Sequence, residues 1–453
     1  MKEHRLICPD PDPAGSEVSE HVSALAKAWR EGEASQISAL ADLLSDASAL
    51  PDLFKITPGG PTYRFLTDFL RYVREAPGRP GAWLERVKEG RGLGEIPVSV
   101  AGFGSPTGAL TAALSAAGAA GGEVVTSSLN YVGVINAIAA SGAVPRFVDI
   151  DPSTWCMDAD AAARAVTGKT RAIILTHLNI FADIWPYEEL FHRRGFDFPL
   201  IQDASLAIAS TREGARPGLV NVGPNGLTVM SLTVSKIFSG MGGAVATSHD
   251  QGILEVMHEI AHQGVSQSNP GELSFFGMNC KMSAINAAIA HAQLRRREEI
   301  VSRRRRLRAA YEKSLAPLVR EGMVSLQELG EETVPTHFGV VLPLERKEVS
   351  TSLQQRFNVQ TGLWHAHHLQ KLYRILLGNS RTRLPATEKL ANGLLFLPFH
   401  TALTEDDVKF ICSSLSSVIS GSASPSRRRV SPKAAAHPRV KTQPSKGRPP
   451  RRR

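Results

Sequence analysis

The chain has 453 residues and 42% of them are hydrophobic, which is enough for a large buried core and two or three structural units. Its apolar runs are shorter than the roughly 18 residues of a membrane-spanning helix, and residues 1–13 lack the apolar region of a secretory signal. Four widely spaced cysteines form no metal-binding pattern. We therefore expect a reduced, cytoplasmic protein that is neither a membrane protein nor a disulfide scaffold.

The net charge of +9 is concentrated at the C-terminal end. Residues 421–453 contain eleven Lys and Arg and no Asp or Glu, so without them the net charge is −2. This segment is rich in Pro and Ser and has almost no large apolar residue, so we predict a disordered basic tail. A solvating tail and a contact with nucleic acid or anionic lipid are both compatible with this composition.

The first predicted elements are helices. Apolar residues at helical spacing predict one over residues 18–44, within an N-terminal extension that we assign to residues 1–50. A second helical pattern covers Tyr63–Arg74.

From residue 96 onward, apolar runs alternate with helical patterns. Strands are predicted at 96–102, 123–127, 144–151, 171–178 and 198–205, and helices at 105–121, 130–143, 158–166 and 186–195. Asp158 is placed to cap its helix, and Gly195 to end the last one. The alternation predicts an α/β domain with a mostly parallel sheet and helices on both faces.

A long helical pattern over residues 282–315 connects this domain to a smaller one. We assign residues 51–320 to the large domain and 321–420 to a small C-terminal α/β domain. The run RRREEIVSRRRRLR (295–308) includes Glu299 and Arg303 at i, i+4 spacing, which predicts a solvated helix face.

Polar side chains follow several of the predicted strands. Ser105 and Thr107 open a helix after the first strand, and Asp203 follows the apolar run at 198–202. Ser231 and Lys236 follow the runs 227–230 and 232–235, and we place Lys236 at a strand end. In parallel sheets, ligands bind beyond the carboxyl ends of the strands, so we expect these side chains to converge on one site.

Each of these residues also has an ordinary structural explanation. Ser105 and Thr107 are suited to cap a helix, and Asp203 to cap a helix or join a salt bridge. Lys236 is suited to extend toward solvent from a strand end.

Together, however, the groups match the needs of pyridoxal phosphate. A lysine amine attacks the cofactor aldehyde, a carboxylate pairs with the protonated ring nitrogen, and a helix N-terminus with hydroxyls binds the phosphate. Tyr131, at the start of the next helix, is placed to stack on the ring, with core packing as the alternative.

With these motifs in place, the sequence resembles the DegT/DnrJ/EryC1/StrS family of pyridoxal-phosphate-dependent sugar aminotransferases, which have fold type I. The resemblance is close over residues 95–300 and looser over 360–415. It is carried by FGSPTGAL (103–110), NYVGVINAI (130–138), QDASLA (202–207), SLTVSK (231–236) with GGAVAT (242–247), and NCKMSAINAAIAHAQL (279–294).

The resemblance implies a role for each matching residue. Lys236 is the Schiff-base lysine, and Asp203 is the partner of the ring nitrogen. Ser105, Thr107 and Ser231 contact the phosphate, and Tyr131 stacks on the ring. Asn279 reaches a phosphate across a dimer interface, with helix capping as its alternative, and His368 is a substrate neighbour.

The implied activity is transfer of an amino group, from glutamate, to a keto-sugar nucleotide in polysaccharide or antibiotic biosynthesis. The implied assembly is a cytoplasmic homodimer with shared active sites. One departure is Leu206, where the family usually has Gln bonded to the phenolic oxygen of the cofactor. It leaves open a dehydratase or a transaminase for another ketone. The basic tail leaves open a non-catalytic regulatory homologue. Lys236 argues against the related dehydratases, which replace this lysine by histidine.

The cluster WHAHHLQ (364–370) contains three histidines. No cysteine or carboxylate is spaced to complete a metal site with them, so we predict no metal.

Overall fold

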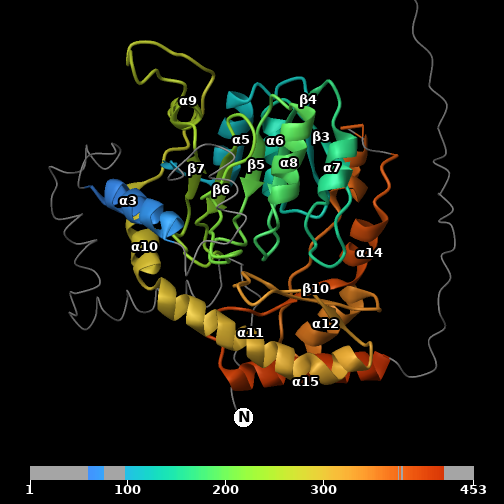
Figure 1. Cartoon of the computed structure of the whole chain (residues 1–453). Helices are drawn as coiled ribbons and strands as arrows, with labels where there is room; N and C mark the ends of the chain where they lie inside the picture. Colours follow the sequence, from blue (N-terminus) through green and yellow to red (C-terminus); the bar gives the residue numbers. More distant parts are fainter. Residues whose placement is uncertain (1–59, 76–96, 376, 379–380, 423–453) are drawn as a thin grey trace, which may run out of the picture.

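The computed structural model describes residues 60–75, 97–375, 377–378 and 381–422 (Figure 1). The predicted helix at 18–44, the rest of the N-terminal extension and almost all of the basic tail lie outside these residues. The predictions for those segments stay predictions.

The large domain is built on a seven-stranded sheet. Its strands are β1 (Ser99–Phe103), β2 (Glu123–Ser127), β3 (Val144–Val148), β4 (Thr170–Thr176), β5 (Leu200–Asp203), β6 (Leu227–Ser231) and β7 (Ala244–Ser248). Their order across the sheet is β1-β7-β6-β5-β4-β2-β3. Only β7 runs antiparallel to its neighbours, so the predicted mostly parallel sheet is confirmed.

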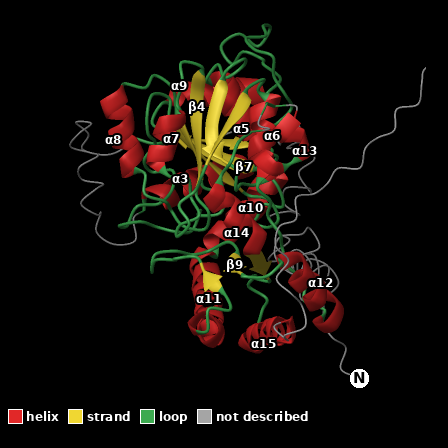
Figure 2. Ribbon diagram, turned by 90° about the vertical axis from the view of Figure 1, so that its right-hand side faces the viewer, coloured by secondary structure: helices red, strands yellow, loops and turns green. Residues whose placement is uncertain are grey.

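Helices cover both faces of this sheet. They are α3 (Pro61–Arg74), α5 (Pro106–Ala116), α6 (Val132–Ala140), α7 (Ala159–Ala165), α8 (Trp185–Arg194), α9 (Gln251–Ala261) and α10 (Ala284–Arg295). Figure 2 shows α7 and α8 on one side of the sheet and α6 on the other. Along β4, Ile173 and Leu175 belong to one apolar core and Ile174 to the other, because successive side chains of a strand point to opposite faces. Among the described residues, no helix combines the length and apolar character needed to cross a membrane.

Local signals act as the sequence suggested. The Asp158 carboxylate accepts a hydrogen bond from the Ala161 amide at 2.7 Å and caps α7. Helix α8 ends at Gly195, whose φ of 59° lies in the left-handed region that glycine adopts without strain.

The small domain has a three-stranded sheet in the order β10-β9-β8, formed by β8 (Ser325–Leu326), β9 (Phe338–Val341) and β10 (Leu394–Leu397). Around it lie α11 (Arg297–Arg320), α12 (Arg346–Phe357) and α15 (Glu405–Ser422), seen below the large domain in Figure 1. Leu307 and Tyr311 of α11 are part of its apolar core. This core therefore includes a helix that the predicted boundary at residue 320 assigned to the large domain.

The prediction of one long helix over 282–315 is wrong, because two helices cover this region. Helix α10 ends at Arg295 and α11 begins at Arg297, with Arg296 as the break.

The arginine run is also less solvated than predicted. Arg304 is completely buried and donates hydrogen bonds to the carbonyls of Thr336 and Phe399. Arg303 bonds the carbonyls of Thr401 and Leu403 instead of pairing with Glu299. These arginines fix α11 to the small domain, which periodicity along one helix does not predict.

The segment between α12 and β10 contains the short helix η2 (His367–Leu369), α13 (Lys371–Ile375) and α14 (Pro385–Gly393). Asp149, which follows β3, accepts hydrogen bonds from the amides of Ala386 and Thr387 at the start of α14. This part of the C-terminal region therefore packs against the large domain.

Candidate active site

The carboxyl ends of β1, β5 and β6 meet at one edge of the large sheet. Ser231 and Phe103 both pair with Ala244, the first residue of β7, and Asp203 pairs with Val229. The convergence predicted from the sequence is therefore present. One detail was wrong: β6 ends at Ser231, and residues 233–238 form turns and bends, so Lys236 does not end a strand.

Lys236 and Tyr131 lie together at this edge. The Lys236 side chain is buried, and its Nζ is 5.9 Å from the centroid of the Tyr131 ring. Tyr131 precedes α6 and is 56% exposed, so it is not packed in the core. Lys236 does not extend into solvent either. The structure thus places an amine beneath an accessible aromatic ring.

Asp203 is a buried carboxylate near the same lysine. It is 5% exposed, and its Oδ1 accepts a hydrogen bond from the Ser205 amide at 3.0 Å. Burial raises the pKa of Asp203, while the hydrogen bond from Ser205 and the charge of Lys236 act in the opposite direction. A positively charged N–H beside this carboxylate would favour its ionised form.

His177 and Gln202 support the strand end that carries Asp203. The His177 amide donates to the Asp203 carbonyl, and its Nδ1 accepts from the Ala182 amide at 3.1 Å. Its proton therefore lies on Nε2, which donates to Gln202 Oε1 at 3.1 Å. Burial lowers the pKa of His177 to about 4, so the ring is neutral. The sequence analysis did not assign a role to either residue, although the polar pair at the ends of two neighbouring strands was a usable signal.

The predicted phosphate contacts lie at the start of α5 and at the end of β6. Ser105 Oγ accepts a hydrogen bond from the Gly108 amide at 3.0 Å, so the capping interpretation is confirmed for this residue. Thr107 is partly exposed and lies against α6. A Cβ atom added to Gly133 of α6 would come within 2.7 Å of Thr107 Oγ1. Ser231 is 1% exposed, and its hydroxyl bonds that of Thr233 at 2.9 Å. Thr233, which is partly exposed, is a further hydroxyl that the sequence analysis missed.

Asn279 has an exposed side chain, and its backbone pairs with His262. It caps no helix, because α10 begins after Ser283, whose hydroxyl accepts from the Asn286 amide. The helix-capping alternative for Asn279 is therefore wrong. The following residue, Cys280, packs against the start of α5.

His368 has no exposed surface and bonds Ser128 and Glu388. Its side chain is therefore not open to a substrate, although the resemblance suggested it as a neighbour. Within the described part of the chain, no group of three His, Cys, Asp or Glu residues is placed to hold a metal ion.

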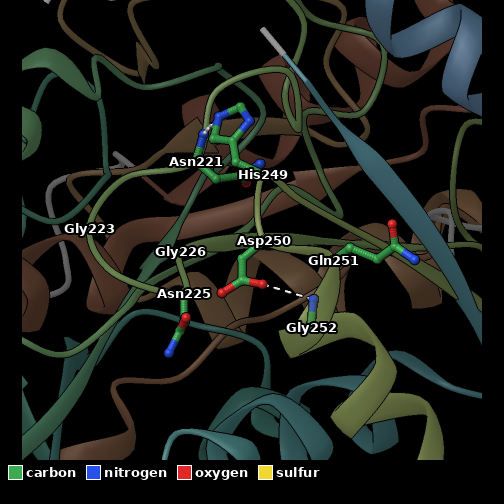
Figure 3. Close-up of a pocket in the computed structure, with 8 residues that line it drawn as sticks. All are labelled: Asn221, Gly223, Asn225, Gly226, His249, Asp250, Gln251 and Gly252. Atoms are coloured by element: carbon green, nitrogen blue, oxygen red, sulfur yellow. Dashed lines mark hydrogen bonds between the residues drawn. The ribbon is translucent and has the colours of Figure 1, made fainter. Parts of the chain in front are cut away.

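A cavity of about 420 Å³ lies at the opposite edge of the sheet, between the loop before β6 and the start of α9 (Figure 3). Its polar groups bond one another. His249 accepts from the Asn221 amide and donates to the Pro97 carbonyl, and Asp250 caps α9 through the Gly252 amide. This cavity is remote from Lys236 and has none of the chemistry described above.

Residues 98–416 match the sequence profile of the DegT/DnrJ/EryC1/StrS aminotransferase family. The chain belongs to this family. A 3-oxo-glucose-6-phosphate:glutamate aminotransferase of Bacillus subtilis strain 168 is 29% identical over 308 residues, 66% of this chain and 67% of that protein. A GDP-perosamine synthase of Caulobacter vibrioides is 30% identical over 319 residues, 69% of this chain and 84% of that protein.

Solved structures of aminotransferases share the fold. TlmJ from Streptoalloteichus hindustanus superposes with a TM-score of 0.64 at 26% identity, over 81% of this chain and 98% of that chain. NtdA from Bacillus subtilis, solved with the cofactor PMP, superposes with a TM-score of 0.64 at 26% identity, over 80% and 81% of the two chains. The protein is thus a fold-type I aminotransferase with pyridoxal phosphate as its cofactor.

The residues present in this aminotransferase fit that cofactor. Asp203 is a buried carboxylate whose raised pKa a protonated ring nitrogen would counteract. Lys236 would supply the amine, and Tyr131 presents an exposed aromatic ring next to it. Hydroxyls and the amides at the start of α5 supply donors for a phosphate.

Proposed function

We propose that this aminotransferase moves an amino group from glutamate to a keto sugar carried on a nucleotide. Support comes from its relatives, which include a GDP-perosamine synthase and a dTDP-4-dehydro-2,3,6-trideoxy-D-glucose 4-aminotransferase of Saccharopolyspora spinosa. The observation that carries the chemistry is the buried Lys236 amine beside the Tyr131 ring and within the field of Asp203.

Pyridoxal phosphate, when bound, supplies an aldehyde that accepts the amino group and a ring that stabilises negative charge on the reacting carbon. Lys236 Nζ holds the cofactor and, once released by the substrate amine, removes a proton from one carbon and returns it to another. Asp203 keeps the ring nitrogen protonated, and Tyr131 covers the ring and excludes water from one face.

Ser105, Thr107 and Ser231 bind the phosphate in this proposal, together with the amide groups at the start of α5. Ser105 would keep its capping bond while its remaining lone pair and proton face the ligand. The Ser231 hydroxyl would exchange its bond with Thr233 for the phosphate, or Thr233 would take its place.

The test is a pair of half-reactions followed by absorbance. Glutamate alone should convert the lysine-bound cofactor to its amine form, and a keto-sugar nucleotide should convert it back. A protein that takes up no pyridoxal phosphate, or whose cofactor glutamate leaves unchanged, would contradict the proposal. A sugar phosphate serves as the second acceptor, because the Bacillus subtilis relative is named for 3-oxo-glucose-6-phosphate. Faster turnover with the sugar phosphate than with the sugar nucleotide would show that the acceptor is a sugar phosphate.

We further propose a cytoplasmic homodimer in which the exposed Asn279 reaches the phosphate in the active site of the second subunit. Exposed Leu273 and Phe276 in the preceding loop supply apolar surface for such an interface. Mixing a Lys236→Ala protein with an Asn279→Ala protein then restores activity above the sum of the two, since one site of the mixed dimer is intact. Failure to restore it, with subunit exchange verified by mass spectrometry, would exclude shared sites.

A further inference from the structure

Residues 128–131, the site loop, carry Tyr131 and are supported by a segment far away in sequence. An isolated antiparallel bridge joins Leu129 to Ala366. The His367 amide donates a hydrogen bond to the Ser128 carbonyl at 3.0 Å. Residues 366–368 are called the support segment below. The backbone of the support segment therefore runs alongside the site loop.

His367 bonds the residue directly before Tyr131. Its Nε2 is 2.9 Å from the Asn130 carbonyl, which can only accept, so the ring proton lies on Nε2. Burial lowers the pKa of His367, and its Nδ1 is a buried atom with no hydrogen-bond partner among the described residues. The neutral form of the His367 ring therefore fits these contacts. Asn130 Oδ1 in turn accepts from the Tyr131 amide at 2.8 Å and from the Thr176 hydroxyl at 3.1 Å.

His368 anchors the other end of the site loop. Its Nδ1 lies 2.7 Å from Ser128 Oγ, and its Nε2 lies 3.2 Å from Glu388 Oε1. A hydrogen bond from the Leu384 amide is the main cause that lowers the pKa of Glu388, so this carboxylate is ionised and accepts from Nε2. Nδ1 then accepts from the Ser128 hydroxyl, which itself accepts from the His368 amide at 3.0 Å.

We propose that His367 and His368 are positioning residues that set the orientation of the Tyr131 ring over Lys236, acting through the site loop. Because Tyr131 is 56% exposed, surrounding side chains enclose its ring only in part. The position of the ring therefore depends on the backbone that carries it. Ser128 and Asn130, which transmit the support, are 0% and 2% exposed and are bonded on both sides. The inference rests on the proposed stacking role of Tyr131.

A double-mutant cycle on cofactor binding tests the inference. Full-length apoprotein is titrated with pyridoxal phosphate, and the visible circular dichroism of the bound cofactor reports the geometry of the ring above it. His367→Leu should weaken binding by about three- to tenfold and change the dichroism, as expected for the loss of one buried hydrogen bond. Tyr131→Ala should weaken binding by about fivefold. With Tyr131 already replaced, His367→Leu should add less than about a twofold further loss, because coupled residues are not additive.

The matched control is His365→Leu. His365 belongs to the same histidine cluster, but it is exposed and faces Arg346, so its replacement should leave cofactor binding and dichroism unchanged. His367→Gln retains an N–H donor and should recover most of the lost affinity. If His367→Leu does not fold, Glu388→Ala tests the same support from the His368 end, at a partly exposed position, in the same cycle.

Two failures are distinguishable. A Tyr131→Ala protein with unchanged affinity and dichroism would contradict the proposed stacking role of Tyr131, and with it the inference. If Tyr131→Ala behaves as expected but His367→Leu has the same effect in both backgrounds, or none, the positioning role alone is overturned.

Discussion

The two edges of the large sheet differ in how their polar groups are satisfied. At the edge shown in Figure 3, His249 uses both ring nitrogens in hydrogen bonds and Asp250 caps α9. At the carboxyl edge, Asp203 is buried with a raised pKa, and Tyr131 is exposed beside the Lys236 amine. The first arrangement stabilises the fold, whereas the second carries a cost that a ligand would offset. The cavity in Figure 3 is therefore no sign of a catalytic site in this protein.

The largest difference between the edges should appear on replacing Lys236. Lys236→Ala removes both the covalent attachment and the proton carrier, so we expect turnover to fall by at least about a thousandfold. Borohydride, which fixes the lysine-bound cofactor covalently, should label the wild type and not the variant, as measured by mass spectrometry. Equal labelling of both proteins would exclude Lys236 as the attachment point.

Asp203→Asn should separate function from stability. We expect turnover to fall by about two orders of magnitude, because the ring nitrogen loses its anionic partner. The cofactor-free protein should gain on the order of 1 kcal/mol in free energy of unfolding at neutral pH, since a buried charge is removed. The gain should shrink as the pH falls through the raised pKa of Asp203, where the wild type becomes neutral as well. Urea unfolding across this pH range measures it, and a destabilised variant at neutral pH would contradict the account.

His177 should make the carboxyl edge sensitive to acid. Its pKa is about 4 in the folded protein and 6.5 ordinarily, so the unfolded chain takes up the proton first as the pH falls. The stability associated with the neutral ring is complete above pH 6.5 and is lost on going down to about pH 4, by up to about 3 kcal/mol. His177→Gln should flatten the dependence of unfolding free energy on pH in this window. The exposed His192→Gln is the control, and an equal change in both variants would refute the prediction.

The smallest effect is expected at the opposite edge. Asp250→Ala removes the cap of α9 and should lower the free energy of unfolding by about 1 kcal/mol. Turnover should stay at the wild-type level, because this edge contributes nothing to the proposed chemistry. A large loss of turnover without a change in stability would show that the comparison between the two edges is wrong.

Much of the large domain follows from local pattern. Apolar runs and alternating helical segments specify the strands and helices, and Asp158 and Gly195 act where the sequence placed them. Parallel strands bring their carboxyl ends to one edge, so the convergence of Asp203 and Ser231 follows from topology. The turns around Lys236 were missed because the run at 232–235, LTVS, alternates apolar and polar residues as a strand does.

Contacts between distant segments were not predictable in the same way. The arginines of α11 resemble a solvated face until the small domain presents its carbonyls to them. The pairing of residues 366–368 with the site loop spans more than half of the chain and leaves no periodic trace in either segment.

The sequence by itself determined the α/β class and the family, and it indicated a set of groups suited to the cofactor chemistry, because hydrophobic periodicity and motif order are local properties of the chain. Only the tertiary structure decided which of those groups are buried and what each one bonds. His368 is the clearest case. The family resemblance suggested that it contacts substrate, and the fold instead encloses it between Ser128 and Glu388. Burial and hydrogen-bond partners are set by residues hundreds of positions apart, which no local pattern encodes.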